Sequence, residues 1–167
     1  ASDVYKRQAA SNGLRIKSAD ISNAYFQGKE LDRILLLKPP RGGLPDLEYE
    51  DGETMILARV PIYGTPDTGR FFWKQFKEVI EKEEFRENEI LKAFYCLTAP
   101  SDGQLICVLG THVDDMMWAA KNSAGTAVQN ILAAFDCRKI EENEFRFGGK
   151  EIKIQIIPIM MQDAQRI

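Results

Sequence analysis

The feature that most constrains the fold is a pair of adjacent aspartates between two apolar runs. Asp114 and Asp115 follow the mainly apolar residues 104–110 and precede the apolar residues 116–119. Such spacing is typical of a β-hairpin, so the sequence predicts antiparallel strands with both carboxylates at the tip. Two carboxylates beside a hydrophobic sheet are costly unless a cation satisfies them. The alternative is an Asp-Asp turn that only faces solvent.

A third carboxylate, Asp20, ends another predicted strand. Residues 14–21 alternate apolar and polar side chains, as a half-buried strand does. Mg²⁺ takes oxygen ligands and commonly uses one or two carboxylates together with substrate phosphates. If Asp20 lies beside Asp114 and Asp115 at one sheet edge, the three would bind two cations ~3.5–4 Å apart, as in phosphoryl-transfer enzymes. We therefore expect a magnesium site at this edge.

The remaining pattern predicts an α+β fold, in which helices pack on one face of an antiparallel sheet. The spacing of Phe72, Phe76, Val79 and Ile80 predicts an amphipathic helix. A second helix is predicted after Ser123, a suitable N-cap. The nearest named motif is the ferredoxin-like split βαβ arrangement. Further extended segments are predicted at 34–37, 55–62, 93–99, 104–109 and 145–157.

Composition limits the class of protein and its partners. The 167 residues are 44% hydrophobic and 28% charged, enough for one domain or a piece of a larger one. A net charge of −3 argues against a free-standing nucleic-acid binder, but not against a catalytic module whose basic surfaces lie on other domains. No apolar run approaches the ~20 residues of a membrane span, so no membrane partner is expected. Three cysteines without CxxC spacing argue against a disulfide framework or a zinc site.

Four motifs, in order, resemble those of copia-type LTR-retrotransposon reverse transcriptases. V-D-D at 113–115 resembles the [Y/F]-x-D-D box, and D-I-S-N-A-Y-F-Q-G at 20–28 resembles motif A, D-V-K-N-A-F-L-H-G. Residues 62–73, I-Y-G-T-P-D-T-G-R-F-F-W, resemble L-Y-G-L-K-Q-A-P-R-A-W-Y. F-G-G-K-E-I at 147–152 resembles F-L-G-I-E-I. The resemblance covers roughly residues 14–155 and implies the palm of a polymerase.

The resemblance implies RNA-directed DNA polymerisation, in which a nucleotide passes from a dNTP to a primer 3′-hydroxyl. The metal ligands would be the carboxylates of Asp20, Asp114 and Asp115 and the backbone carbonyl of Ile21. One Mg²⁺ would lower the pKa of the primer hydroxyl, and the other would neutralise the triphosphate and the leaving pyrophosphate. Mn²⁺ is an alternative to Mg²⁺.

Substrate-binding residues also follow from the resemblance. Tyr25 matches the aromatic sugar gate, which would favour dNTPs, although a core aromatic is the alternative. Tyr63 and Gly64 match the motif B turn, which lies beside the incoming nucleotide and the template base. Arg138 or Lys139 would lie near the triphosphate.

The same resemblance predicts the surroundings of the palm. Gly148 and Gly149 would form the turn that holds the primer end. Residues 9–157 would be a palm without fingers or thumb, after a non-native or artefactual leader at 1–8 and before a tail at 158–167. Its partners would be a primed RNA or DNA template, a dNTP, and the polyprotein's fingers, thumb, RNase H and integrase. Its location would be the cytoplasm, inside virus-like particles.

Some positions depart from the family pattern. Pro66, Asp67 and Gly69 stand where Lys, Gln and Pro are usual, and Asp67 is expected to weaken nucleotide binding through like-charge repulsion. His112 stands where Tyr is usual before the carboxylates. Two other functions stay open: an inactive fragment or relic of such an element, and another two-metal palm-fold enzyme such as a nucleotidyl cyclase.

Overall fold

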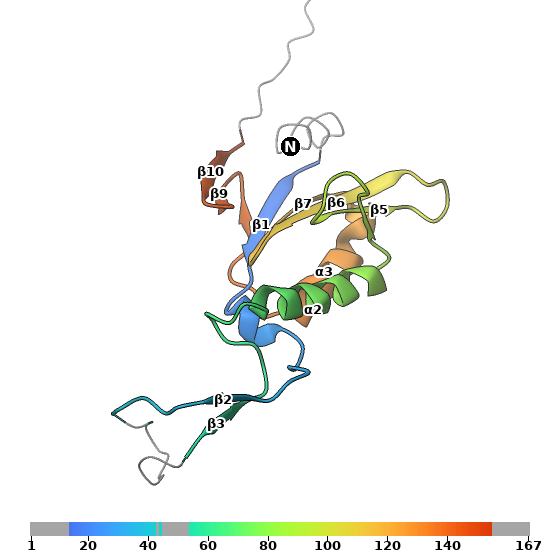
Figure 1. The fold of residues 1–167 in the computed structure, drawn as a ribbon. Helices are drawn as coiled ribbons and strands as arrows, with labels where there is room; N and C mark the ends of the chain where they lie inside the picture. The colour runs from blue at the N-terminus through green and yellow to red at the C-terminus, as the bar shows by residue number, and fades with distance from the viewer. Residues whose placement is uncertain (1–13, 43, 45–53, 155–167) are drawn as a thin grey trace, which may run out of the picture.

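The main sheet is antiparallel and has six strands in the order β4-β5-β6-β7-β1-β8 (Figure 1). The structure is a computed structural model that describes residues 14–42, 44 and 54–154. The strand β1, which comes first in the chain, pairs with β7 on one side and β8 on the other. The strands are β1 Ile16–Asp20, β4 Arg86–Glu87, β5 Phe94–Thr98, β6 Leu105–His112, β7 Asp115–Ala120 and β8 Glu141–Glu142.

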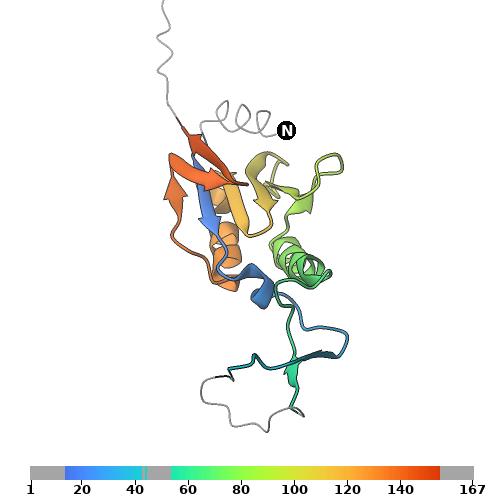
Figure 2. The ribbon, with the colours of Figure 1, turned by 60° about the vertical axis from the view of Figure 1, so that its left-hand side comes forward.

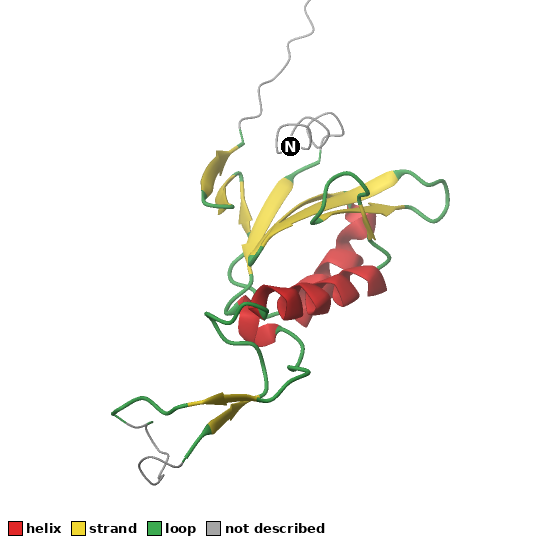
Figure 3. Cartoon of the chain, in the orientation of Figure 1, coloured by secondary structure: helices red, strands yellow, loops and turns green. Residues whose placement is uncertain are grey.

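Two helices in the described part of the chain, α2 (Thr68–Lys82) and α3 (Gly125–Ala134), lie on one face of this sheet (Figure 3). The predicted apolar stripe of α2 is confirmed, since Phe72, Phe76 and Ile80 are buried. The ring of Phe76 stacks on that of Phe135, which directly follows α3, with centroids 5.6 Å apart. The sheet side of this core includes Ala19, Ile21, Tyr95, Leu109, Met116 and Trp118.

The opposite face of the sheet carries the predicted carboxylates. Successive strand residues point to opposite faces, so Asp20 lies on the face away from the helices, while Ala19 packs under them. A second hairpin, β9 (Glu144–Phe147) and β10 (Lys150–Lys153), covers part of this face. Its Phe145 and Ile152 pack against Met117 of β7. Figure 2 shows this hairpin beside β1.

A third, separate hairpin projects from the sheet and helices as an arm (Figure 1). It consists of β2 (Leu35–Leu37) and β3 (Ile56–Ala58), and it exposes the opposed pair Leu36 and Leu57. The short 3₁₀ helix η1 (Ala24–Gln27) leads from β1 toward it. Neither helix of the described residues has the length and apolar character needed to cross a membrane.

The prediction that Ser123 caps the second helix is wrong. Ser123 lies inside a 3₁₀ turn, η2 (Asn122–Ala124), and Ala124 directly precedes α3 without any side-chain cap. The backbone itself bonds the entering N–H groups, since Ala124 donates to Lys121 and Gly125 donates to Asn122. The predicted leader at 1–8, the tail at 158–167 and the end of the extended segment at 155–157 lie outside the described residues.

Candidate active site

Asp20 and Asp115 are direct neighbours on two antiparallel strands. The Ile21 N–H donates to the Asp114 carbonyl at 2.8 Å. Asp20 and Asp115 are therefore a non-hydrogen-bonded pair, in which the Cα atoms lie about 4.5 Å apart and the side chains are close. Like charges opposed in this way destabilise a sheet. A cation that binds both carboxylates would relieve that repulsion.

Asp114 lies in the predicted hairpin turn. His112 pairs with Asp115, so Val113 and Asp114 form the two-residue connection between β6 and β7. Val113 has a φ of 57°, which β-branched residues rarely adopt. Such a conformation costs on the order of 1–3 kcal/mol and persists only when its surroundings hold it. The tip next to the carboxylates is therefore strained.

Arg138 contacts Asp20. Its Nε lies 3.3 Å from Asp20 Oδ1, and its backbone N–H donates to the Asp20 carbonyl at 2.8 Å. Lys139 is exposed and makes no such contact. Of the two basic residues considered from the sequence, Arg138 is thus the one beside a predicted ligand, and its exposed guanidinium partly offsets the local negative charge.

The Gly148-Gly149 turn lies against Asp115. Gly148 N–H donates to Asp115 Oδ2 at 2.8 Å. Both glycines have positive φ, 56° and 75°, as a two-residue hairpin turn between paired strands requires. A Cβ on Gly148 would meet the His112 ring at 3.5 Å, so the turn lies against one side of this exposed residue.

A cleft of about 350 Å³ opens at this end of the sheet. The Tyr25 ring lies 4.8 Å from that of Tyr63 and 6.4 Å from that of the buried Phe72. Tyr25 thus borders the cleft and also packs on the core, so both sequence-based interpretations describe part of its environment. The cleft is lined by Ala24, Tyr25, Tyr63, His112, Val113, Asp114, Asp115 and Gly149.

Phe26 has no predicted role, yet it contacts Tyr63, which lines the cleft. Its ring lies 5.6 Å from that of Tyr63, edge to face, and it is half exposed. The available signal was an aromatic residue directly after Tyr25 in a segment that was already assigned to the site.

Gly64 and Asp67 follow Tyr63 closely in the sequence. Gly64 is exposed with a φ of 93°, which explains why this turn needs a glycine, but it does not line the cleft. Asp67, expected to repel phosphates, has a partner: Arg33 donates to both of its carboxylate oxygens. These hydrogen bonds lower the pKa of Asp67. The charge of Asp67 is therefore neutralised within the chain.

The carboxylate and carbonyl oxygens at this end of the sheet suit a hard cation. In the described part of the chain, no group of three or more His, Cys, Asp or Glu side chains is close enough to hold a metal as it stands. Mg²⁺ does not require one, because it keeps several waters and binds through one or two carboxylates plus phosphates. The Ile21 N–H points at Asp114, and a strand residue's carbonyl points to the same side as its N–H. No described residue donates to that carbonyl, which is thus free to act as a ligand.

The Cys137 thiol lies near the charges of Asp20 and Asp136 at this end of the sheet. Burial, with the charges of Asp136 and Asp20, raises the pKa of Cys137 to about 11. At neutral pH the thiol is therefore protonated as long as no cation binds to it. The donor set is made of carboxylates and carbonyls, which suit Mg²⁺ or Mn²⁺.

The structure gathers most of the predicted site residues at one end of the sheet. Asp114, Asp115, Tyr25, Tyr63 and Gly149 line the cleft. Asp20 and Gly148 adjoin it through Asp115, Ile21 through Asp114, and Arg138 through Asp20. Gly64 and Lys139 are outside its lining. In comparisons with known proteins, no family model, no curated protein and no solved structure matches the chain.

Proposed function

We propose that the chain is a ferredoxin-like polymerase palm that performs RNA-directed DNA synthesis in a copia-type retrotransposon polyprotein. The observation that carries the proposal is the opposed pair Asp20 and Asp115, with Asp114 next to it in the hairpin turn. These carboxylates come from two motifs far apart in the sequence, and antiparallel pairing of β1 with β7 brings them to one end of the sheet. Helices on the opposite face leave this end open to a substrate.

In this proposal Asp20, Asp114, Asp115 and the Ile21 carbonyl hold Mg²⁺. The ions, when bound, lower the pKa of the primer 3′-hydroxyl and neutralise the charge of the triphosphate. The Gly148 N–H engages Oδ2 of Asp115, which fixes the carboxylate and leaves Oδ1 for a cation. Arg138 is exposed beside Asp20, from where its guanidinium can bind phosphate oxygens.

Tyr25 is the proposed selector of the sugar. Its ring is held between Tyr63 and Phe72, and its position is therefore fixed from two sides. If the Tyr25 ring lies beneath the sugar of the nucleotide, the 2′-hydroxyl of a ribonucleotide would clash with the ring. The proposed substrate is accordingly a dNTP, added to the 3′ end of a primer on an RNA or DNA template.

The charge of the chain is compatible with such a role if other domains grip the nucleic acid. A net charge of −3 provides little attraction for phosphates. We propose that the fingers, thumb, RNase H and integrase of the polyprotein are its partners, in cytoplasmic virus-like particles. The ion pair of Asp67 with Arg33 removes one argument for an inactive relic, since that aspartate is not an unpaired charge.

Primer extension tests the proposal. The chain is assayed with Mg²⁺, dTTP and oligo(dT) on poly(rA), both alone and joined to the fingers of a copia-type polymerase. We expect extension by the joined protein and by its Asp102→Asn control, because Asp102 lies in the β5–β6 turn outside the cleft. Asp115→Asn should abolish extension. Primer extension by Asp115→Asn would contradict the proposal. No extension by any of the proteins would favour the alternative, an inactive relic of such an element.

A further inference from the structure

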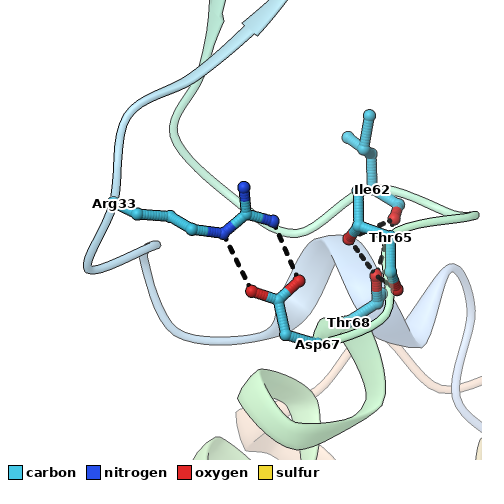
Figure 4. A network of polar contacts seen from close by, with 5 residues as sticks. All are labelled: Arg33, Ile62, Thr65, Asp67 and Thr68. Atoms are coloured by element: carbon cyan, nitrogen blue, oxygen red, sulfur yellow. Dashed lines mark hydrogen bonds and ion pairs between the residues drawn. The ribbon is translucent and has the colours of Figure 1, made fainter.

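The turn that carries Tyr63 is fastened to the start of α2 (Figure 4). The Ile62 carbonyl accepts hydrogen bonds from the Thr65 N–H at 3.3 Å and from the Thr68 hydroxyl at 2.7 Å. Thr68 is buried, so its hydroxyl is held in one place. These hydrogen bonds therefore connect the first turn of α2 to Ile62, the neighbour of Tyr63.

The first turn of α2 is in turn held by an ion pair. Arg33 Nε and Nη2 donate to the two oxygens of Asp67 at 2.9 and 3.0 Å (Figure 4). Asp67 occupies the N-cap position of α2, where an aspartate ordinarily accepts a bond from the helix's own N–H groups. Here the side chain makes no such bond and binds Arg33 instead. The carboxylate thus connects the helix to a segment 34 residues earlier.

The segment of Arg33 is the base of the arm formed by β2 and β3. Just before it, Gly28 packs so closely on α2 that a Cβ would lie 3.0 Å from the Phe72 nitrogen. Leu31 N–H donates to the Arg59 carbonyl at 2.8 Å, which joins the two sides of the arm. Arg33 therefore comes from a segment whose position against α2 is already fixed, and it can act as an anchor for Asp67.

We propose that Arg33 and Asp67 are positioning residues that hold the Tyr63 turn against Tyr25 and thereby set the affinity for the nucleotide. Neither residue lines the cleft, so both are proposed to act through the turn. They act through Thr68 and Ile62 on Tyr63, whose ring packs 4.8 Å from that of Tyr25. This inference rests on the proposed function for its ligand, a dNTP, but not for the fastening of the turn.

The geometry of the ion pair requires an arginine at position 33. A guanidinium binds a carboxylate through two parallel N–H groups, and a lysine ammonium cannot reproduce that fork. Arg33 is exposed and Asp67 is partly exposed, so the effects will be modest. We expect about three- to fivefold changes, in line with exposed ion pairs.

Amide hydrogen exchange of the full chain tests the fastening of the turn. Arg33→Lys, Arg33→Gln and Asp67→Asn should each accelerate exchange in peptides that cover residues 62–71 by about three- to fivefold. The reversed pair, Arg33→Asp with Asp67→Arg, should restore slow exchange. The matched control is Lys29→Gln, which breaks the neighbouring ion pair with Glu78 and should leave residues 62–71 unchanged. Wild-type exchange in all single variants, or an equal effect of Lys29→Gln, overturns the inference.

Calorimetric titration with dTTP in the presence of Mg²⁺ tests the nucleotide affinity, with each protein joined to the fingers of a copia-type polymerase. The single variants should bind about three- to fivefold more weakly than the wild-type chain, and the reversed pair should recover affinity. Unchanged dTTP affinity together with accelerated exchange overturns the link between the turn and the nucleotide. If the wild-type chain joined to the fingers binds no dTTP, the proposed function and this link both fail, while the exchange experiment still decides whether the pair holds the turn.

Discussion

The two faces of the main sheet use the same strands for different purposes. On the helix-covered face, Ala19 and Met116 are buried in an apolar core. On the opposite face, the directly adjacent residues Asp20 and Asp115 are partly exposed and repel each other. Alternation along a strand separates the two sets by a single residue. Stability and chemistry should therefore respond to different substitutions, even at neighbouring positions.

The largest effect should follow damage to the helix-covered face. Phe76→Ala removes a ring that is 2% exposed and stacked on Phe135, so we expect a loss of about 3–5 kcal/mol of unfolding free energy. Urea denaturation measures this value. The control Arg70→Ala, at an exposed site of the same helix, should change it by less than about 0.5 kcal/mol. A loss below about 1 kcal/mol for Phe76→Ala would show that this face is not the stabilising one.

Substitution on the opposite face should reduce activity and leave stability nearly unchanged. Asp115→Asn removes the repulsion with Asp20, and its amide oxygen can still accept the Gly148 N–H. We expect stability within about 1 kcal/mol of wild type and at least a roughly hundredfold loss of polymerisation. Asp114→Asn should likewise abolish polymerisation without unfolding the chain. Thermal melts and primer extension on the same samples decide this, and unfolding of Asp115→Asn would contradict the separation of the two faces.

A smaller effect should come from the strained tip of the hairpin. Val113→Gly relieves a φ of 57° but adds flexibility to the unfolded chain, so we expect a net gain of up to about 1 kcal/mol. The control Val113→Thr keeps a β-branched side chain and should bring no gain. Equal melting temperatures for the glycine and threonine variants would indicate that this turn stores no strain.

The smallest effect should be the acid dependence of the arm's ion pair. Arg33 lowers the pKa of Asp67 below its unfolded value of 3.8, so the pair stabilises the fold above that pH. The contribution is lost as the pH falls through the lowered pKa. Melting temperatures of wild type and Arg33→Gln should therefore differ slightly at neutral pH and converge in acid. A difference that grows toward low pH would have the wrong sign.

Local patterns predicted the parts of the fold that depend on neighbouring residues. The α2 stripe and the β6–β7 hairpin follow from spacing within a few residues, and the structure contains both. The start of α3 was predicted wrongly at Ser123, because a 3₁₀ turn bonds the entering backbone and leaves the serine no role as a cap. The two-residue strands β4 and β8 are too short to leave a pattern.

Contacts between distant segments limit how much of the site can be predicted from the sequence. The carboxylates were found through motifs, but their register, Asp20 opposite Asp115, depends on the pairing of strands that many residues separate. The Arg33–Asp67 pair has no local signal at all, since its members lie 34 positions apart. From sequence, Asp67 was therefore an unfavourable charge, and only the fold gives it a partner.

The central claim is that a cation binds at the end of the sheet where Asp20 and Asp115 lie. Calorimetric titration with Mn²⁺ tests this claim most directly. The wild-type chain and the Asp102→Asn control should bind Mn²⁺ with the same affinity. Asp20→Asn and Asp115→Asn should each weaken binding at least about tenfold, because each removes a charged oxygen ligand. Binding that is equal in all four proteins, or no binding by the wild-type chain at millimolar Mn²⁺, would contradict the account.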